Sequence, residues 1–474
     1  MKSSRVLILF FALCSFSIAQ IDKKELLQTV ELLSSKEFAG RLPGHSGYTK
    51  AANFISGEMT KLKLKPAGDS EYYQKLKVEY NEILAPEHFA IIKSGTRTEY
   101  KLGPDYVYRG FTGSGQLIAN TAFCGYGLSQ PELGYDDYAN IDVKGKVAIV
   151  FKYNPKWNLN GKGFTNGNPR EKAIVAAKHG AIGILFVSLP NDAEPQKPIG
   201  SVIHGEGVQM QNFPEIHIDL RLADELFDGS GKTLKELQTQ IDADKTPNSI
   251  SLLHKVDIEI HTKYEKEKEV FNIVGMLEGI DPELKNEYLI LGAHLDHVGE
   301  QAGKIYFPGA NDNASGSAAL LEIARTMVAN NIKPKRSIIF AFFASEEQGL
   351  NGATHFANHL PIPLEKVKAM FNMDCVGYGD SIQIGGGKSA PELWAMAKKI
   401  DSENDRLVIP ATWSGGGADA EPFYQKGIKT LYFVTKNSYK HLHMLSDKPE
   451  TLNPELFQAI TKLAYKTALT LVLN

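Results

Sequence analysis

Apolar positions recur along the chain with two different periods, and these periods predict its elements. Near the N-terminus, residues 22–34 and 47–64 have the spacing of amphipathic helices, whereas residues 73–102 alternate between apolar and polar as a strand does. The turn-rich segment A-G-R-L-P-G-H-S-G lies between the two helices, at 39–47.

The middle of the chain predicts short strands and a helix. Strands are expected at 117–124, 146–151 and 181–187, and a helix closed by Gly180 is expected at 169–180. Residues 251–261 alternate with period two. The charged run K-Y-E-K-E-K-E at 263–269 predicts a solvated hairpin or sheet edge, to which we assign no function.

From residue 270 onward, strand, loop and helix follow one another in repeated order. The predicted strands are 288–293, 336–343, 367–373, 381–385 and 429–434, and the predicted helices are 314–329, 349–359, 389–402 and 452–472. Such alternation indicates an α/β fold in which a mostly parallel sheet is covered by helices on both faces.

Acidic and histidine side chains follow the strands of this α/β region. They are His294, Asp296 and His297 after 288–293, Asp312 before 314–329, Glu346 and Glu347 after 336–343, Asp374 after 367–373, and the segment H-L-H-M-L-S-D (441–447) after 429–434. Because ligands of open α/β sheets bind at the carboxyl ends of the strands, we expect these side chains to converge on one rim.

The residue types at this rim suit a metal centre. Histidines and carboxylates without thiols favour zinc over calcium or magnesium. More than three candidate ligands indicate two metal ions about 3.5–4 Å apart, and Asp312, on its glycine-flanked loop, is the natural bridge. Of Glu346 and Glu347, one can bind metal while the other acts as general base, and Asp296 can orient the imidazole of His294.

Each of these residues also has an ordinary structural explanation. Asp312 could be a helix N-cap, Asp374 a hydrogen-bonded strand end, and the glutamates a solvated pair. Their joint occurrence at successive strand ends favours the metal centre.

The composition excludes several classes of protein. The 474 residues include 52 basic and 55 acidic side chains, a net charge of −3, whereas a nucleic-acid binder needs a basic surplus. Three cysteines are too few for a disulfide framework or a cysteine-based zinc knuckle. The length predicts two or three domains, or one large domain with an insertion.

The first 19 residues have the pattern of a secretory signal peptide. Lys2 and Arg5 precede an apolar run, and a small-x-small cleavage site ends at Ala19. We expect cleavage after Ala19 and an exported protein, periplasmic or extracellular. We expect no membrane span in the mature chain, because no later stretch reaches about 18 apolar residues. A buried N-terminal helix is the alternative.

Four segments together resemble the co-catalytic two-zinc aminopeptidase family, which includes glutamate carboxypeptidase and glutaminyl cyclase relatives. They are G-A-H-L-D-H-V-G (292–299), G-A-N-D-N-A-S-G-S-A-A-L-L-E-I-A-R (309–325), F-F-A-S-E-E-Q-G-L-N-G-A (342–353) and N-M-D-C-V-G (372–377), within a similarity over roughly 20–105 and 265–474. The resemblance implies two Zn²⁺ per chain, with His294 and Asp374 on one, Glu347 and His443 on the other, Asp312 bridging and Glu346 as general base. It also implies a cis peptide bond at Asp312–Asn313.

The last ligand and the substrate pocket depart from the family pattern. His443 is preferred to His441 because it precedes Asp447 by the family's spacing. Leu442 stands where relatives often carry a carbonyl-stabilising tyrosine, and we expect Tyr439 or another group to substitute for it. The segment S-G-G-G-A-D-A-E-P-F (414–423) replaces a Ser-Asp-His-x-x-Phe-like pocket motif, without its histidine.

Residues 110–262 resemble a protease-associated domain, a β-rich insert. The segments that carry this similarity are C-G-Y-G-L (124–128), Y-D-D-Y-A-N-I-D-V-K-G-K-V-A-I-V (135–150), A-A-K-H-G-A-I-G-I-L-F-V (176–187) and F-P-E-I-H-I (213–218). The family resemblance assigns 20–109 and 263–474 to a peptidase domain around this insert, whose role is open between a passive structural one and gating of substrate.

The family resemblance implies an exported zinc aminopeptidase acting on peptides with a free N-terminus. Two zinc ions would hold and acidify a bridging water, and Glu346 would take its proton. Three alternatives stay open: a carboxypeptidase, which needs an arginine cluster; a glutaminyl cyclase, which uses one zinc; and an inactive binding receptor, which would have lost ligands.

Overall fold

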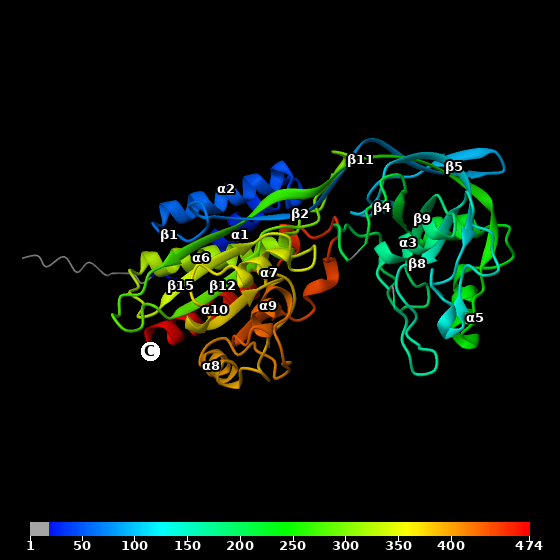
Figure 1. The fold of residues 1–474 in the computed structure, drawn as a ribbon. Helices are drawn as coiled ribbons and strands as arrows, with labels where there is room; N and C mark the ends of the chain where they lie inside the picture. Colours follow the sequence, from blue (N-terminus) through cyan, green and yellow to red (C-terminus); the bar gives the residue numbers. More distant parts are fainter. Residues whose placement is uncertain (1–18, 166, 206) are drawn as a thin grey trace, which may run out of the picture.

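The computed structural model describes residues 19–165, 167–205 and 207–474, and the predicted signal peptide lies almost entirely outside them. Two lobes stand side by side (Figure 1). We call residues 19–72 and 278–474 the main lobe and residues 94–249 the insert lobe. The long strands β2 (Tyr73–Lys93) and β11 (Ile250–Leu277) run through both and pair antiparallel.

The sheet of the main lobe has the order β17-β18-β16-β12-β15-β11. Its added strands are β12 (Tyr288–His294), β15 (Ser337–Phe343), β16 (Val367–Met373), β17 (Ile382–Gly385) and β18 (Thr430–Thr435). The four strands β18, β16, β12 and β15 are parallel, and β17 and β11 flank them antiparallel. The predicted α/β fold with a mostly parallel sheet is therefore confirmed.

Alternate residues of the buried strands face two different helical layers. In β15, Ile338 and Phe340 join one apolar cluster, and Ile339 and Ala341 join another. The first cluster is covered by α1 (Lys23–Leu33), α2 (Ser46–Lys61), α6 (Gly316–Ala329), α8 (Pro391–Ser402) and α10 (Pro454–Leu473), and the second by α7 (Asn351–Asn358) and α9 (Glu421–Gln425). Because both faces are covered, the strands are continuous hydrophobic runs.

The insert lobe continues the sheet from β11 in the order β5-β8-β9-β10-β4. Its strands are β4 (Tyr106–Tyr108), β5 (Gly115–Phe123), β8 (Val147–Phe151), β9 (Gly183–Val187) and β10 (Glu215–Ile218), and its helices are α3 (Pro169–Lys178), α4 (Leu220–Phe227) and α5 (Leu234–Asp244). The predicted strands and the helix α3 are present. The helices α4 and α5 were not predicted.

The charged run 263–269 lies inside β11, where it forms a sheet edge rather than a hairpin. It pairs with β2 alone, whereas residues before and after it also pair with β5 and β15. Since none of residues 263–269 is itself buried, no apolar alternation marks this run as a strand.

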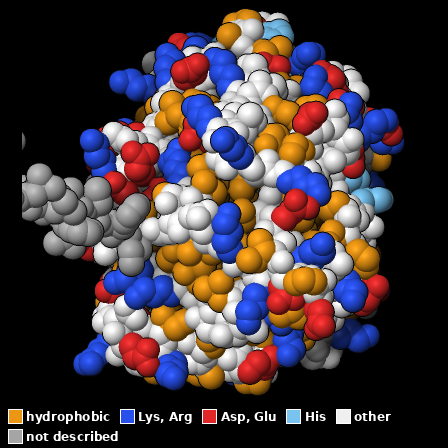
Figure 2. Space-filling view, turned by 90° about the vertical axis from the view of Figure 1, so that its left-hand side faces the viewer, with side chains coloured by type: hydrophobic (Ala, Val, Ile, Leu, Met, Phe, Trp, Pro, Cys, Tyr) orange, Lys and Arg blue, Asp and Glu red, His pale blue; other side chains and the backbone are white. Residues whose placement is uncertain are grey.

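The end of the main lobe opposite the insert carries both signs of charge. On this face, basic and acidic side chains are interspersed, with apolar side chains between them (Figure 2). In the described part of the chain, no helix is both long enough and apolar enough to span a membrane.

Candidate metal centre

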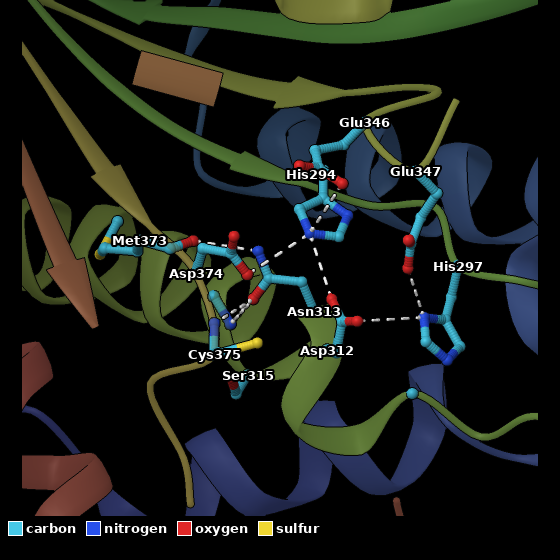
Figure 3. Close-up of polar contacts among 12 residues, drawn as sticks. His294, His297, Asp312, Asn313, Ser315, Glu346, Glu347, Met373, Asp374 and Cys375 are labelled. Carbon is cyan, nitrogen blue, oxygen red and sulfur yellow. Dashed lines mark hydrogen bonds and ion pairs between the residues drawn. The ribbon is translucent and has the colours of Figure 1, made fainter. Parts of the chain in front are cut away.

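All seven predicted site residues meet at the carboxyl ends of the parallel strands. His294 ends β12, the two glutamates follow β15 and Asp374 follows β16 (Figure 3). Asp312 comes from the loop before α6, and His443 from the loop after β18. The topology thus brings together groups that lie up to 149 residues apart (443 − 294) in the chain.

The first cluster consists of His294, Asp312 and Asp374, all buried. His294 Nε2 lies 3.3 Å from Asp312 Oδ1 and 3.4 Å from Asp374 Oδ1. His294 Nε2 and Asp374 Oδ1 are buried and have no hydrogen-bond partner among the described residues. Since buried polar atoms are normally paired, these two atoms are suited to bind a metal ion together.

The second cluster consists of His297, Asp312, Glu347 and His443. His443 Nε2 lies 2.8 Å from Glu347 Oε2 and 3.2 Å from Asp312 Oδ2. Asp312 therefore offers one carboxylate oxygen to each cluster, which is the arrangement of a bridging ligand. His441 belongs to neither cluster, and its Nδ1 instead lies 2.9 Å from Ser446 Oγ.

His297 received no role from the sequence, although it follows the same strand as His294. Its Nδ1 lies 2.9 Å from Glu347 Oε1 and 3.7 Å from Asp312 Oδ2 (Figure 3). The ring is fully buried, and its Nε2 lacks a hydrogen-bond partner within the described ranges. The sequence signal for it was the second histidine of G-A-H-L-D-H-V-G.

The loop that carries Asp312 is fixed by Asp447. The Asn311 and Asp312 N–H groups donate to the two oxygens of Asp447, at 2.9 and 3.0 Å. The Asp312–Asn313 peptide bond is cis, as the family resemblance implied. The side chain of Asp312 caps no helix, since α6 begins after Ser315 without a side-chain cap.

Asp296 links the first histidine to both glutamates. Its carboxylate accepts from the Glu346 N–H at 3.1 Å and from the Glu347 N–H at 3.3 Å. One of its carboxylate oxygens lies 3.7 Å from His294 Nδ1, whereas its backbone O lies 3.2 Å from that nitrogen. The carboxylate of Asp296 thus binds the glutamate loop, and its backbone carbonyl is the group within hydrogen-bond distance of the imidazole.

Glu346 stands apart from the metal-type clusters. Its Oε2 lies 4.0 Å from His294 Nε2, beyond hydrogen-bond distance. Burial, together with the nearby carboxylates of Asp419 and Glu347, raises the pKa of Glu346 well above its ordinary range. The pKa of Glu347 is lowered instead. Burial and the charge of Asp312 act to raise it, but His443 and His297 outweigh them. The pKa values of the two neighbouring glutamates are thus shifted in opposite directions.

A cavity of about 900 Å³ is lined in part by Tyr432, the tyrosine that contacts Asp374. Tyr432 donates its hydroxyl to Asp374 Oδ2 at 3.2 Å, and the Tyr439 hydroxyl lies 3.1 Å from that of Tyr432. The cavity is lined by aromatic rings, by lysines of the loop after β18 and by one residue of the insert lobe: Tyr378, Trp413, Tyr432, Tyr439, Lys436, Lys440 and Glu194.

Asp419, from the segment that replaces the family's pocket motif, was not predicted. It is fully buried, and neither of its oxygens has a hydrogen-bond partner in the part of the chain that the structure describes. Burial and the charges of the neighbouring Asp374 and Asp296 raise its pKa well above the ordinary range.

A known protein family matches part of each lobe. Residues 272–468 match Peptidase family M28, and residues 113–226 match the PA domain. The chain is 25% identical over 377 residues to the Aminopeptidase of Pseudomonas aeruginosa, with 76% of this chain covered. It spans only 59% of the length of that relative.

Two further matches cover nearly the whole chain. Aminopeptidase YwaD of Bacillus subtilis is 24% identical over 455 residues, which is 92% of this chain and 82% of that protein. The structure of BSAP, a zinc aminopeptidase from Bacillus subtilis, aligns over 96% of both chains with a TM-score of 0.65 at 19% identity. This structural likeness establishes the shared fold.

Proposed function

Because residues 272–468 match Peptidase family M28 and residues 113–226 match the PA domain, we propose that the protein is an exported zinc-dependent aminopeptidase that removes the N-terminal residue of peptides. In this proposal, residues 20–109 and 263–474 form the peptidase domain and residues 110–262 the insert. Export rests on the predicted signal peptide. Aminopeptidases among the relatives support the activity.

The observation that carries the proposal is the pair of clusters that share Asp312. Their nitrogen and carboxylate donors, without a thiol, suit zinc, and His294 Nε2 and Asp374 Oδ1, which have no hydrogen-bond partner among the described residues, are free to bind an ion. One zinc would be held by His294, Asp374 and Asp312. The other would be held by Glu347, His443 and Asp312, with His297 beside it. Two bound zinc ions would polarise the scissile carbonyl and acidify the attacking water.

Glu346 is the general base of this mechanism. It lies beside the first cluster, and its raised pKa suits a carboxylate that takes a proton from water and returns it to the leaving amine. The Asp296 carboxylate keeps Glu346 in place through the Glu346 backbone N–H, and the Asp296 backbone carbonyl keeps His294 in its ligating orientation.

The cavity lined by Tyr432 is the place for the substrate's first side chain. The free α-amino group would bind beside the second cluster and its acidic neighbours, which restricts cleavage to the N-terminus. The Tyr432 hydroxyl contacts Asp374, and the Tyr439 hydroxyl contacts that of Tyr432. Either hydroxyl can supply the carbonyl-stabilising donor that position 442 lacks.

A carboxypeptidase of the same family is the second candidate. Lys436 and Lys440 line the cavity and could bind a substrate carboxylate. The arginine cluster expected of such an enzyme is not part of this lining.

The test uses the purified protein with zinc and a panel of dipeptides. We expect cleavage of dipeptides with a free amino group, whether the C-terminus is a free acid or an amide, and no cleavage of N-acetylated ones. Cleavage that depends on a free C-terminal carboxylate and tolerates N-acetylation would support the carboxypeptidase instead. Metal analysis should find about two zinc ions per chain, and a single ion with full activity would favour the cyclase-like alternative.

A further inference from the structure

The turn-rich segment at 39–47 has no role in the proposed reaction, yet it contains an unusual backbone. Ala39, Gly40 and Arg41 are three consecutive residues in the left-handed region, with φ of 44°, 66° and 52°. Non-glycine residues adopt this conformation at a cost, so the surroundings must hold it in place.

The backbone of this turn docks on the loop that follows β12. The Gly299 N–H donates to Gly40 O at 2.9 Å, and the His297 N–H donates to Arg41 O at 3.2 Å. A Cβ atom on Gly40 would lie 2.2 Å from Gly299 O, so only glycine permits this approach.

The side chain of Arg41 is fully buried and donates only to backbone carbonyls. Nε donates to Leu295 O at 2.9 Å, and Nη2 donates to Gly309 O at 2.8 Å. Nη1 donates to Pro308 O at 2.8 Å and to Leu33 O at 2.6 Å. The planar guanidinium thus joins three segments through a fixed set of donors.

Two of these segments carry the site. Leu295 lies between His294 and Asp296, and Pro308 and Gly309 lead into the Asp312 loop. Burial lowers the pKa of Arg41 to about 10, and nearby carboxylates, led by Asp312 and Asp447, act against that shift. The guanidinium is therefore charged at neutral pH and offsets the negative charge of the centre.

We propose that Arg41 is a positioning residue of the metal centre, which fixes the distance between the histidine loop after β12 and the Asp312 loop. The inference rests on the proposed function in one respect, namely that the two clusters bind zinc. Because Asp312 belongs to both clusters, loss of the guanidinium fork should weaken both metal sites.

The test compares Arg41→Lys with Arg336→Lys. Arg336 is a control at the other end of the sheet, where its guanidinium donates to the Leu471 backbone carbonyl at 3.1 Å and to the Glu287 carboxylate at 2.8 Å. Zinc affinity is measured by chelator competition, and unfolding of the zinc-free proteins is followed by calorimetry. We expect Arg41→Lys to bind both zinc ions about 10–100-fold more weakly, as for other residues that orient metal ligands. Its zinc-free form should stay folded, and Arg336→Lys should keep the wild-type affinity.

A second variant, Arg41→Ala, adds a readout that a purely structural role would not move. Added guanidinium or methylguanidinium ions should restore part of its zinc affinity, because they can occupy the vacated space. Wild-type zinc affinity in Arg41→Lys would overturn the proposal. So would failure of both variants to fold without zinc, because Arg41 would then serve the fold as a whole. Wild-type protein that binds two zinc ions but cleaves no peptide would contradict the proposed function and leave this inference standing.

Discussion

Glu346 and Glu347 follow the same strand but enter different surroundings. Ser345, just before them, has a left-handed backbone with φ of 57°, so the chain turns as it leaves β15. Glu347 meets His297 and His443, at 2.9 and 2.8 Å, whereas Glu346 comes no closer than 4.0 Å to His294. The two side chains can therefore hold different roles, one as ligand and the other as base.

This difference predicts opposite behaviour of the two amide variants. Glu346→Gln keeps size and hydrogen bonding but cannot accept a proton, so kcat should fall by about 10²–10⁴-fold with both zinc ions retained. Glu347→Gln removes a charged ligand, so zinc affinity should fall first and excess zinc should restore part of the activity. Zinc titration with measurement of kcat tests both variants. A Glu346→Gln protein that loses zinc and is rescued by it would reverse the assigned roles.

The two histidines of H-L-H-M-L-S-D form a matched pair. His443→Ala should lose one zinc ion and most activity, because its Nε2 lies within reach of Glu347 and Asp312. His441→Ala should change activity by less than about twofold, since it contacts Ser446 and belongs to neither cluster. Elemental analysis and kcat/KM for both variants decide the matter. The opposite order would show that the last ligand is misassigned.

At the scale of elements, the rim could be predicted because strand ends were visible in the sequence. Buried parallel strands are continuous apolar runs, so the polar residue that ends each run marks the carboxyl edge, as His294 does for β12. What the sequence could not indicate were contacts made by buried backbone. Arg41 and Asp447 act through carbonyl and N–H groups of distant loops, and no side-chain pattern encodes those partners.

Another such contact joins the insert lobe to the site. The Gly200 N–H donates to His443 O at 2.8 Å, and His443 has a left-handed backbone with φ of 55°. Val202 of the same loop packs in one apolar cluster with Val298 and Phe307 of the main lobe. The insert therefore helps to hold the backbone of one of the expected zinc ligands.

Because of this contact, adding one methyl group to the insert lobe at Gly200 should change the properties of the metal centre. A Cβ on Gly200 would lie 2.6 Å from Val298 Cγ2 and 3.0 Å from Phe307 Cε2, so in Gly200→Ala either the loop or these two side chains must shift. We expect kcat and zinc affinity to fall several-fold, on the order of 1 kcal/mol. Gly163→Ala, in the same lobe with no atom near the added Cβ, is the control. Equal zinc affinity in the two variants would limit the insert to a passive role.

At the scale of the whole molecule, the two lobes share strands rather than a linker. The pairing of β2 with β11 extends from Ile273–Tyr73 in the main lobe to Lys255–Ile92 in the insert lobe, with two register shifts on the way. Separate domains joined by a flexible segment often unfold independently. Here, unfolding of either lobe would unpair strands that the other lobe needs.

The shared strands predict one cooperative transition, and the tryptophans can report it lobe by lobe. Trp157 packs against Tyr126 and Tyr135 in the insert lobe, whereas Trp394 and Trp413 lie in the main lobe. Zinc at about 1,000 times its Kd should stabilise the native state by about 4 kcal/mol. Although the zinc ligands lie in the main lobe, the transition seen by Trp157 should rise by the same number of degrees as that seen by the other two. Thermal unfolding of Trp157→Phe and of Trp394→Phe/Trp413→Phe, with and without zinc, separates the signals. If the Trp157 transition stayed in place while the other moved, the lobes would unfold independently and the long strands would not couple them.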